Sequence, residues 1–258
     1  MTPVQGEKAD RFRSLHEGEP FVIPNPWDGG SARMLESLGF QALATTSSGF
    51  AFTLGRKDGQ VTLDELAAHV ALLCDVTAVP VAVDLENGYG PEPGAAITRV
   101  AEAGAVGGSI EDYSPDSGLY ELDQAVERLG NAIEAARALD FPFTLTARAE
   151  NHIRGNPDID DTIARLQAYE AAGADVLFAP GLRDAEQIRA VTSAVSRPVN
   201  VLAHRGLTLD EIVGAGAQRI SVGGALTLVA AGAMRRAAEQ IRDSGDFSVL
   251  SERPPLAD

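Results

Sequence analysis

The sequence predicts a single α/β domain in which eight short strands alternate with helices. Apolar runs of β-branched and small residues recur along the chain, and stretches with helical spacing of apolar residues separate them. One sequence pattern, a helix end followed by a glycine and a short turn into a strand, recurs at Gly39, Gly104, Gly173 and Gly216. The 258 residues contain no linker-like segment. Repeated βα units at this length favour a closed TIM-type (β/α)8 barrel over an open doubly wound sheet.

Each predicted strand is short, and turn formers bound it. The strands are expected at 21–24, 41–45, 81–83, 107–110, 143–147, 175–179, 198–203 and 219–222. The helices are expected at 31–38, from a Thr62–Glu65 capping box onward, and at 95–103, 122–138, 160–172, 185–195, 209–215 and 227–242. We therefore predict one domain over residues 1–258, with the barrel at about 20–242 and loosely attached termini.

Composition excludes several classes of partner. The net charge of −16 argues against binding to nucleic acid, which needs a basic surface. The one cysteine, Cys74, excludes an internal disulfide and a cysteine-based metal cage. There is no apolar segment of 18 residues, and the polar stretch 5–13 does not resemble a signal peptide. We expect a cytoplasmic protein that does not bind membranes.

Two carboxylates follow the strand predicted at 81–83. Asp84 and Glu86 are two residues apart, so they lie on one side of an extended chain, and Gly88 and Gly90 then end the strand. Acidic side chains beside glycines at a strand end are typical of a site for a hard cation or of an acid/base pair. For any single acid the alternative is an ordinary solvated strand end.

Other predicted strands also end in polar residues, and in a (β/α)8 barrel these ends gather around the active site. These residues are Asp28, Thr46, Ser47, Glu111, Asp112, Arg148, Glu150, His152, His204 and Arg205. Asp84, Glu86 and Glu111 come from adjacent strands, and an all-oxygen ligand set suits Mg²⁺ or Mn²⁺. Arg148 suits bidentate binding of a substrate carboxylate or phosphonate, although an internal ion pair with Glu150 or Glu111 is the alternative.

Three motifs in this order resemble the isocitrate lyase/phosphoenolpyruvate mutase family. They are Asp84-x-Glu86-x-Gly88-Tyr89-Gly90, Ile110-Glu111-Asp112 and Ala147-Arg148-Ala149-Glu150, and Asn25-Pro26-Trp27-Asp28 agrees with them. The similarity extends over roughly residues 21–236. It implies a (β/α)8 barrel whose last helix is swapped with a neighbouring subunit, usually in a dimer of dimers. It also implies Mg²⁺ and a small 2-oxo-acid-like substrate that reacts through an enolate.

The resemblance also suggests roles for individual residues. It implies that Asp84 binds the metal directly and that Glu86 and Glu111 hold it largely through water. Asp58 matches the acid of a mobile gating loop, and the glycines Gly55 and Gly59 flank it. The alternative role for Asp58 is an exposed ion pair with Arg56 or Lys57. The remaining assignments are Arg148, Asp58 and Glu150 as catalytic residues and Thr46, Ser47, Arg148, His152 and His204 as residues that bind the substrate.

One loop departs from the family pattern. After the Ile-Glu-Asp strand, lyases of this family carry a loop whose cysteine transfers a proton at the substrate carbon, and phosphonomutases carry an Asn-Ser-Leu-rich loop. This chain has the shorter segment 113–120, in which Ser117-Gly118 is the nearest match to Cys-Gly. A serine hydroxyl without an adjacent base is a poor substitute for a thiol. Ordinary isocitrate or methylisocitrate cleavage is therefore not expected.

Three functions are consistent with these residues. The first is a Mg²⁺-dependent lyase that cleaves or forms a C–C bond of a small 2-oxo or 2-hydroxy carboxylic acid. The second is a phosphonomutase or phosphonopyruvate hydrolase, which acts on a P–C bond. The third is a 2-oxo-acid-binding protein that keeps the metal site without turnover. The substrate itself is not identified by the sequence.

Overall fold

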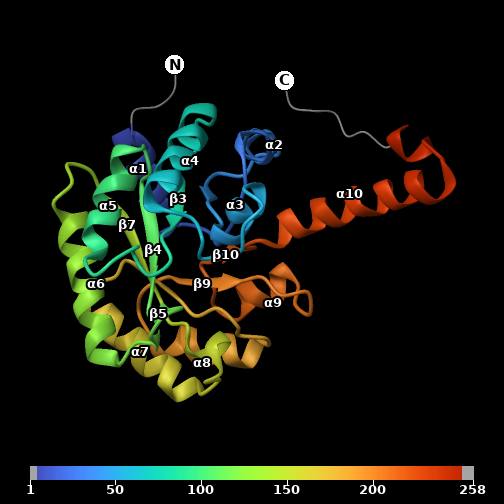
Figure 1. The fold of residues 1–258 in the computed structure, drawn as a ribbon. Coiled ribbons are helices and arrows are strands. Elements are labelled where there is room, and N and C mark those ends of the chain that lie inside the picture. The colour runs from blue at the N-terminus through green and yellow to red at the C-terminus, as the bar shows by residue number, and fades with distance from the viewer. Residues whose placement is uncertain (1–4, 252–258) are drawn as a thin grey trace.

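Eight parallel strands form a nearly closed barrel in the computed structural model, which describes residues 5–251 (Figure 1). The hydrogen-bonded order is β1-β10-β9-β8-β7-β4-β3-β2, and every pair in it is parallel. The strands are β1 (Phe21–Ile23), β2 (Leu43–Ala44), β3 (Val81–Asp84), β4 (Gly107–Glu111), β7 (Thr144–Arg148), β8 (Val176–Phe178), β9 (Val199–Leu202) and β10 (Arg219–Ser221). The predicted α/β barrel is confirmed.

Side-chain and loop contacts join the two edge strands, β1 and β2. The Ala44 amide donates to the Pro24 carbonyl at 3.1 Å. The Asn25 side-chain amide donates to the carbonyls of Ala44 and Thr45, and its oxygen accepts from the backbone amides of Val222 and Gly223. One asparagine thus connects β1 to the neighbouring edge and to the loop after β10. It does so at the mouth of the barrel, where the strands end.

Helices surround the strands, close to the predicted ranges. They are α2 (Gly29–Ser37), α4 (Leu63–Val76), α5 (Pro93–Glu102), α6 (Leu122–Arg137), α7 (Ile159–Ala172), α8 (Ala185–Ala194) and α9 (Leu209–Gly214). The Thr62 and Glu65 side chains form the expected capping box of α4. Three short elements at strand ends were not predicted: α3 (Ser47–Thr53), the hairpin β5 (Tyr113–Ser114) with β6 (Gly118–Leu119), and η1 (Asn151–Arg154).

The N-terminal end of the barrel is covered by α1 (Gln5–Leu15), a helix that the sequence analysis did not predict. Phe12 is completely buried, and its ring lies so close to Gly107 of β4 that a Cβ there would meet it at 2.7 Å. The Lys8 ammonium donates to the Thr77 carbonyl at 2.8 Å. This segment was expected to be loosely attached. It is instead packed, because its apolar residues cover strands that would otherwise be open to solvent.

The last long helix, α10 (Ala225–Ser244), projects away from the barrel (Figure 1). Leu228, Val229 and Met234 are each about two-thirds exposed on it, at 68%, 66% and 66%. A short 3-10 turn, η2 (Ser248–Ser251), follows α10, and the rest of the predicted loose tail, 252–258, lies outside the described residues. In the part of the chain that the structure describes, no helix is long and apolar enough to span a membrane.

The hydrophobic core lies mainly between the strands and the surrounding helices. Its largest cluster joins residues of β3, β4, β7 and β8 to the apolar faces of α4 to α8. The inside of the barrel differs, because buried Thr146, Asn200, Arg219 and Ser221 all contribute side chains there. Barrel interiors are usually filled by branched apolar residues. The inside of this barrel therefore contains polar side chains, from the middle of the strands to their carboxyl ends.

Candidate active site

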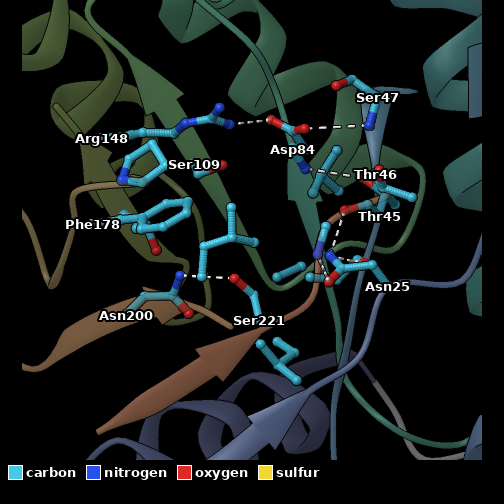
Figure 2. Close-up of a pocket in the computed structure, with 18 of the residues that line it drawn as sticks. Asn25, Thr45, Thr46, Ser47, Asp84, Ser109, Arg148, Phe178, Asn200 and Ser221 are labelled. Atoms are coloured by element: carbon cyan, nitrogen blue, oxygen red, sulfur yellow. Dashed lines mark hydrogen bonds and ion pairs between the residues drawn. The ribbon is translucent and has the colours of Figure 1, made fainter. Parts of the chain in front are cut away.

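A cavity of about 170 Å³ opens at the carboxyl ends of the strands and extends into the barrel (Figure 2). Its rim includes five of the residues assigned from the sequence: Thr46, Ser47, Asp58, Asp84 and Arg148. Other lining residues had no predicted role. Asn25, Phe178 and Ser221 lie at strand ends, and Ser109, Thr146, Asn200 and Arg219, from positions before the strand ends, form the deeper wall. The cavity lies where parallel barrels carry their active sites.

Asp84 lies at the centre of the rim, at the end of β3. Figure 2 shows its carboxylate between Arg148 on one side and Ser47 on the other. One oxygen accepts from Arg148 Nη1 at 3.4 Å, and the other accepts from the Ser47 backbone amide at 3.3 Å. The Asp84 amide donates to Thr45 Oγ1 at 2.9 Å. These contacts are long or local, which leaves the carboxylate able to contact a ligand in the cavity.

Arg148, at the end of β7, is held by three carboxylates. Its Nε donates to Glu150, its Nη1 contacts Asp84, and its Nη2 lies 3.4 Å from Glu111. The guanidinium also lies over the Phe178 ring, 5.4 Å from its centre. Burial alone would lower the pKa of Arg148, but the three carboxylates raise it above its usual value. The side chain is therefore a fixed cation, positioned for a planar anionic group.

Glu86 and Glu111 flank the rim but do not line the cavity. Burial raises the pKa of Glu86 to about 7, and the charge of Asp84 adds to this effect. The Tyr89 hydroxyl donates to Glu86 at 3.0 Å, and both residues have positive φ, 48° and 59°. Burial likewise raises the pKa of Glu111 to about 8. Unusual backbone conformations and raised carboxyl pKa values are features that gather at functional sites.

The donor set at the rim suits a hard divalent cation with few direct protein ligands. Within residues 5–251, no three acidic, histidine or cysteine side chains converge into a preformed metal cage. Asp84 alone of the three predicted acids lines the cavity. Mg²⁺ commonly keeps several of its waters and takes one or two carboxylates directly. The three predicted acids supply only oxygen ligands: Asp84 lies at the cavity, and Glu86 and Glu111 lie behind it. This arrangement fits that mode of binding. The metal-binding role of the three acids stays a prediction.

Asp58 lies on the loop between α3 and α4. The loop is exposed, yet Asp58 lines the cavity, and its charge contributes to the raised pKa of Glu86. Gly55 and Gly59 flank it with φ of 66° and 79°, conformations that other residues rarely adopt. Arg56 pairs with Glu65 at 2.8 Å instead of with Asp58. The structure thus brings Asp58 to the cavity on a segment with two permissive backbone positions.

Glu150 has a different place from the one expected of a catalytic acid. It is completely buried behind Arg148 and does not line the cavity. Besides Arg148, it accepts from Arg154 Nε at 2.9 Å, and its backbone amide donates to Asp112 at 2.7 Å. Asp112 in turn pairs with Arg165 at 3.0 Å. Glu150 therefore fixes the Arg148 guanidinium from behind, and a buried network holds Glu150.

Neither histidine assigned to the substrate lines the cavity. The His152 ring lies in η1 with Nδ1 3.0 Å from Thr162 Oγ1 of α7. His204 is exposed beyond the end of β9, where its Nδ1 accepts from the Gly206 amide at 3.2 Å. Both follow strands in sequence, but a position after a strand did not bring either side chain to the cavity. Asp28, another acid at a strand end, caps α2 through a bond from the Ser31 amide at 2.7 Å.

The hairpin β5–β6 occupies the place of the lyase loop. Ser117 is exposed at its turn and does not line the cavity. Tyr113 of the hairpin stacks against the Arg154 guanidinium, with 3.8 Å between the guanidinium carbon and the ring centre. Among the described residues that line the cavity there is no cysteine and no histidine. No side chain of the hairpin therefore supplies an obvious acid or base to the cavity.

Several polar residues of the deeper wall could have been found by their spacing. Thr144, Thr146 and Arg148 alternate along β7, and Arg219 and Ser221 alternate along β10. Residues two apart on a barrel strand share a side, so a polar side chain two positions before a strand-end arginine points into the barrel. A search restricted to strand ends identified the residues of the rim and missed the residues of this wall.

Comparisons with known proteins agree with this geometry. The family model of phosphoenolpyruvate phosphomutase matches residues 12–242. The 2-methylisocitrate lyase of Halalkalibacterium halodurans is 31% identical, over 93% of this chain and 84% of that protein. The oxaloacetate decarboxylase of Paraburkholderia xenovorans is 36% identical, over 73% of this chain and 66% of that protein. A crystal structure described as a lyase/mutase from Burkholderia cenocepacia is 50% identical with a TM-score of 0.94, and covers 97% of this chain and 93% of that one.

Proposed function

Because this chain belongs to the phosphoenolpyruvate mutase/isocitrate lyase superfamily and is an enzyme of that lyase or mutase type, we propose that it is a Mg²⁺-dependent lyase. Its substrate is a small 2-oxo or 2-hydroxy carboxylic acid, in which a C–C bond is cleaved or formed through an enolate. One observation carries the proposal: the Arg148 guanidinium and the Asp84 carboxylate face one cavity, 3.4 Å apart. A cation fixed beside an acidic ligand group suits a substrate that is both an anion and a metal chelator.

Arg148 binds and orients the substrate carboxylate. Its position is set before the substrate arrives, because Glu150 and Glu111 hold it from behind. The Ser47 amide, at the start of α3, points toward the same part of the cavity. Together the guanidinium and the amide stabilise negative charge that develops on the reacting carboxylate and enolate oxygens. This arrangement requires little reorganisation during the reaction.

Asp84 would hold Mg²⁺ directly, and Glu86 and Glu111 would hold its bound waters. The raised pKa values of both glutamates fit this role, because a nearby cation favours their ionised forms. When bound, Mg²⁺ supplies a Lewis acid for the oxygens of the 2-oxo acid. Asp58, on its glycine-flanked loop, would close over the cavity and exclude water from it.

The absence of any hairpin side chain from the cavity lining favours one reaction within this class. Cleavage of a 2-hydroxy acid needs a base that removes the hydroxyl proton and an acid that protonates the carbon fragment, whereas decarboxylation needs only the second. No cysteine or histidine of the described chain lines the cavity. Decarboxylation of a 3-carboxy-2-oxo acid releases CO₂ and leaves an enolate, which water can protonate. We therefore place oxaloacetate-type decarboxylation first among the C–C reactions.

Two alternatives differ in what Arg148 binds and in whether turnover occurs. In P–C chemistry, by a phosphonomutase or phosphonopyruvate hydrolase, Arg148 would bind a phosphonyl group, and the match to the phosphoenolpyruvate phosphomutase model favours this reading. A 2-oxo-acid-binding protein without turnover is the other alternative. It is favoured by the exposed position of Ser117, which leaves the hairpin without a reactive group.

A metal-dependent substrate screen distinguishes these functions. Oxaloacetate, 2-hydroxy diacids and phosphonopyruvate are incubated with the enzyme with and without Mg²⁺, and released 2-oxo acid, CO₂ and phosphate are measured. We expect Mg²⁺-dependent release of pyruvate and CO₂ from oxaloacetate above the uncatalysed rate. Phosphate release from phosphonopyruvate alone would favour P–C chemistry. Binding of oxaloacetate without any product would favour the binding protein. The variant Arg148→Gln is the control for reaction outside the site.

We propose in addition that α10 packs on a neighbouring subunit, in a dimer of dimers. Leu228, Val229 and Met234 form an exposed apolar surface on a helix that leaves the barrel. Such a surface is larger than an isolated helix needs. Light scattering at micromolar concentration should give a mass of about four chains, and the triple exchange of these residues for glutamate should lower it. A stable monomer in the unchanged protein would contradict the proposal.

A further inference from the structure

The floor of the cavity contains an arginine that has no acidic partner. Arg219 of β10 is only 6% exposed, and it lines the cavity from inside the barrel. Its Nε donates to Asn200 Oδ1 at 2.9 Å, its Nη2 donates to Thr146 Oγ1 at 2.9 Å, and its Nη1 lies 3.1 Å from His16 Nε2. Within the described residues, it forms no ion pair. A buried cation is normally neutralised by a carboxylate or another anion.

The histidine beside Arg219 does not change this charge balance. His16 Nδ1 lies 2.8 Å from the Phe12 carbonyl, which can only accept, so Nδ1 carries the proton and Nε2 accepts from Arg219. Burial lowers the pKa of His16 to about 3, and the Arg219 charge lowers it further. All three protein partners of the guanidinium are therefore neutral. Its positive charge is left uncompensated by the chain.

The guanidinium also keeps hydrogen-bonding capacity. It carries five N–H groups, and the three contacts use one on each nitrogen. One N–H on Nη1 and one on Nη2 remain, the two nitrogens that form the fork for a carboxylate. Asn200, which orients Nε, is itself fixed by a bond from its Nδ2 to Ser221 Oγ at 3.0 Å. Figure 2 shows Asn200 and Ser221 on the side of the cavity away from Asp84 and Ser47.

We propose that Arg219 forms a second anion subsite, which binds the distal carboxylate of a four-carbon dicarboxylic 2-oxo acid while the rim binds the other end. Thr146, which contacts Arg219, and Arg148 are two residues apart on β7, a rise of roughly 7 Å along the strand. The two carboxylates of a four-carbon diacid point away from each other at the ends of a short chain, so such a molecule reaches from the rim toward the floor. This inference rests on the proposed function, because the rim is taken as the site that binds the 2-oxo carboxylate end.

The subsite selects dicarboxylates over monocarboxylates. A monocarboxylate of equal length would leave a methyl group beside the uncompensated guanidinium and its two free N–H groups. A second carboxylate neutralises the charge and accepts both hydrogen bonds. Specificity of this kind depends on the cost of leaving buried polar groups without a partner. The cavity floor would therefore distinguish substrates that the rim binds equally well.

Calorimetric titration of a matched pair of 2-hydroxy acids tests the subsite. Malate and 2-hydroxybutyrate differ only in whether the last carbon is a carboxylate or a methyl group. In the presence of Mg²⁺ we expect the unchanged enzyme to bind malate at least about 10-fold more tightly. Arg219→Gln should reduce the ratio to about 2-fold or less while leaving 2-hydroxybutyrate affinity similar, and Arg219→Lys should restore part of it. Asn200→Ala, which removes the acceptor of Nε, is a second variant in case Arg219→Gln does not fold.

Three results would overturn the subsite. The first is equal affinity of the unchanged enzyme for malate and 2-hydroxybutyrate. The second is an unchanged ratio in both Arg219→Gln and Asn200→Ala. The third is that inorganic phosphate protects the enzyme from heat through Arg219 without competing with malate, which would assign the floor to a free anion. These results are independent of turnover. Malate selectivity without oxaloacetate turnover would sustain the subsite and reject only the proposed reaction.

Discussion

Two arginines inside the same barrel have opposite electrostatic surroundings. Arg148 at the rim has three carboxylates around it, and they raise its pKa. Arg219 at the floor has only neutral partners, and burial lowers its pKa to about 9. The comparison shows that the surroundings, and not the residue type, decide what an arginine contributes. The rim holds its cation in place at all times, whereas the floor leaves its cation to be neutralised by a ligand.

The largest effect is expected from removing the rim cation. Arg148→Gln should lower kcat/KM on the true substrate by at least about 1,000-fold, roughly 4 kcal/mol of barrier. Folding should survive, because Glu150 still accepts from Arg154 at 2.9 Å. Arg148→Lys is the matched control, which keeps the charge but loses the fork. Kinetics of Arg148→Gln within tenfold of the unchanged enzyme would show that the rim arginine is only part of an internal ion pair.

The next effect concerns metal binding at the rim. Asp84→Asn should weaken Mg²⁺ or Mn²⁺ binding at least about 100-fold, close to 2.7 kcal/mol, because it removes the carboxylate that lines the cavity. Calorimetric titration of the metal measures it. Asp116→Asn removes the same charge from the exposed hairpin and should leave the affinity unchanged. Equal metal affinity in the two variants would mean that Asp84 is not a ligand.

The buried His16, beside Arg219, predicts that the free energy of unfolding depends on pH. His16 has a pKa of about 3 in the folded protein and about 6.5 when unfolded. Below pH 6.5 the unfolded chain therefore binds the extra proton, so stability is present above that pH and is lost as pH falls toward 3. His16 should lower the free energy of unfolding by about 2 kcal/mol between pH 7 and pH 5.

Denaturant titrations at both pH values measure this loss. His69, whose pKa burial lowers to about 4, acts in the same direction. His16→Gln should therefore reduce the loss and not abolish it, and His69→Gln serves as the comparison. The same loss in His16→Gln as in the unchanged protein would indicate that His16 is not buried in its neutral form.

The smallest effect is expected at the loop that covers the rim. Asp58→Ala should reduce turnover by at least about tenfold, roughly 1.4 kcal/mol of barrier, with nearly unchanged Tm. The residue is exposed and lines the cavity, so its removal affects the closed site and not the core. Lys57→Ala on the same loop is the control and should change neither quantity. A large drop in Tm with Asp58→Ala would make the residue structural.

Much of the fold could be predicted from local patterns in the sequence. Helix caps such as Thr62 with Glu65, and glycines at helix ends, act within a few residues, so they indicate the elements directly. The strand-end rule then pointed to Asp84, Arg148, Thr46 and Ser47, and all four line one cavity. These predictions succeeded because they depend on neighbours in the chain and on a topology that many sequences share.

The tertiary structure alone decided which polar residues face the cavity. His152 and His204 follow strands as Arg148 does, but neither lines the cavity, and Glu150 lies behind Arg148. The helix α1 had no strong pattern of its own and is fixed by burial of Phe12 beneath the barrel. Whether the charge of Arg219 is compensated likewise depends on the residues around it in the folded chain. Orientation, burial and charge compensation are sums over residues far apart in sequence, and no local pattern contains them.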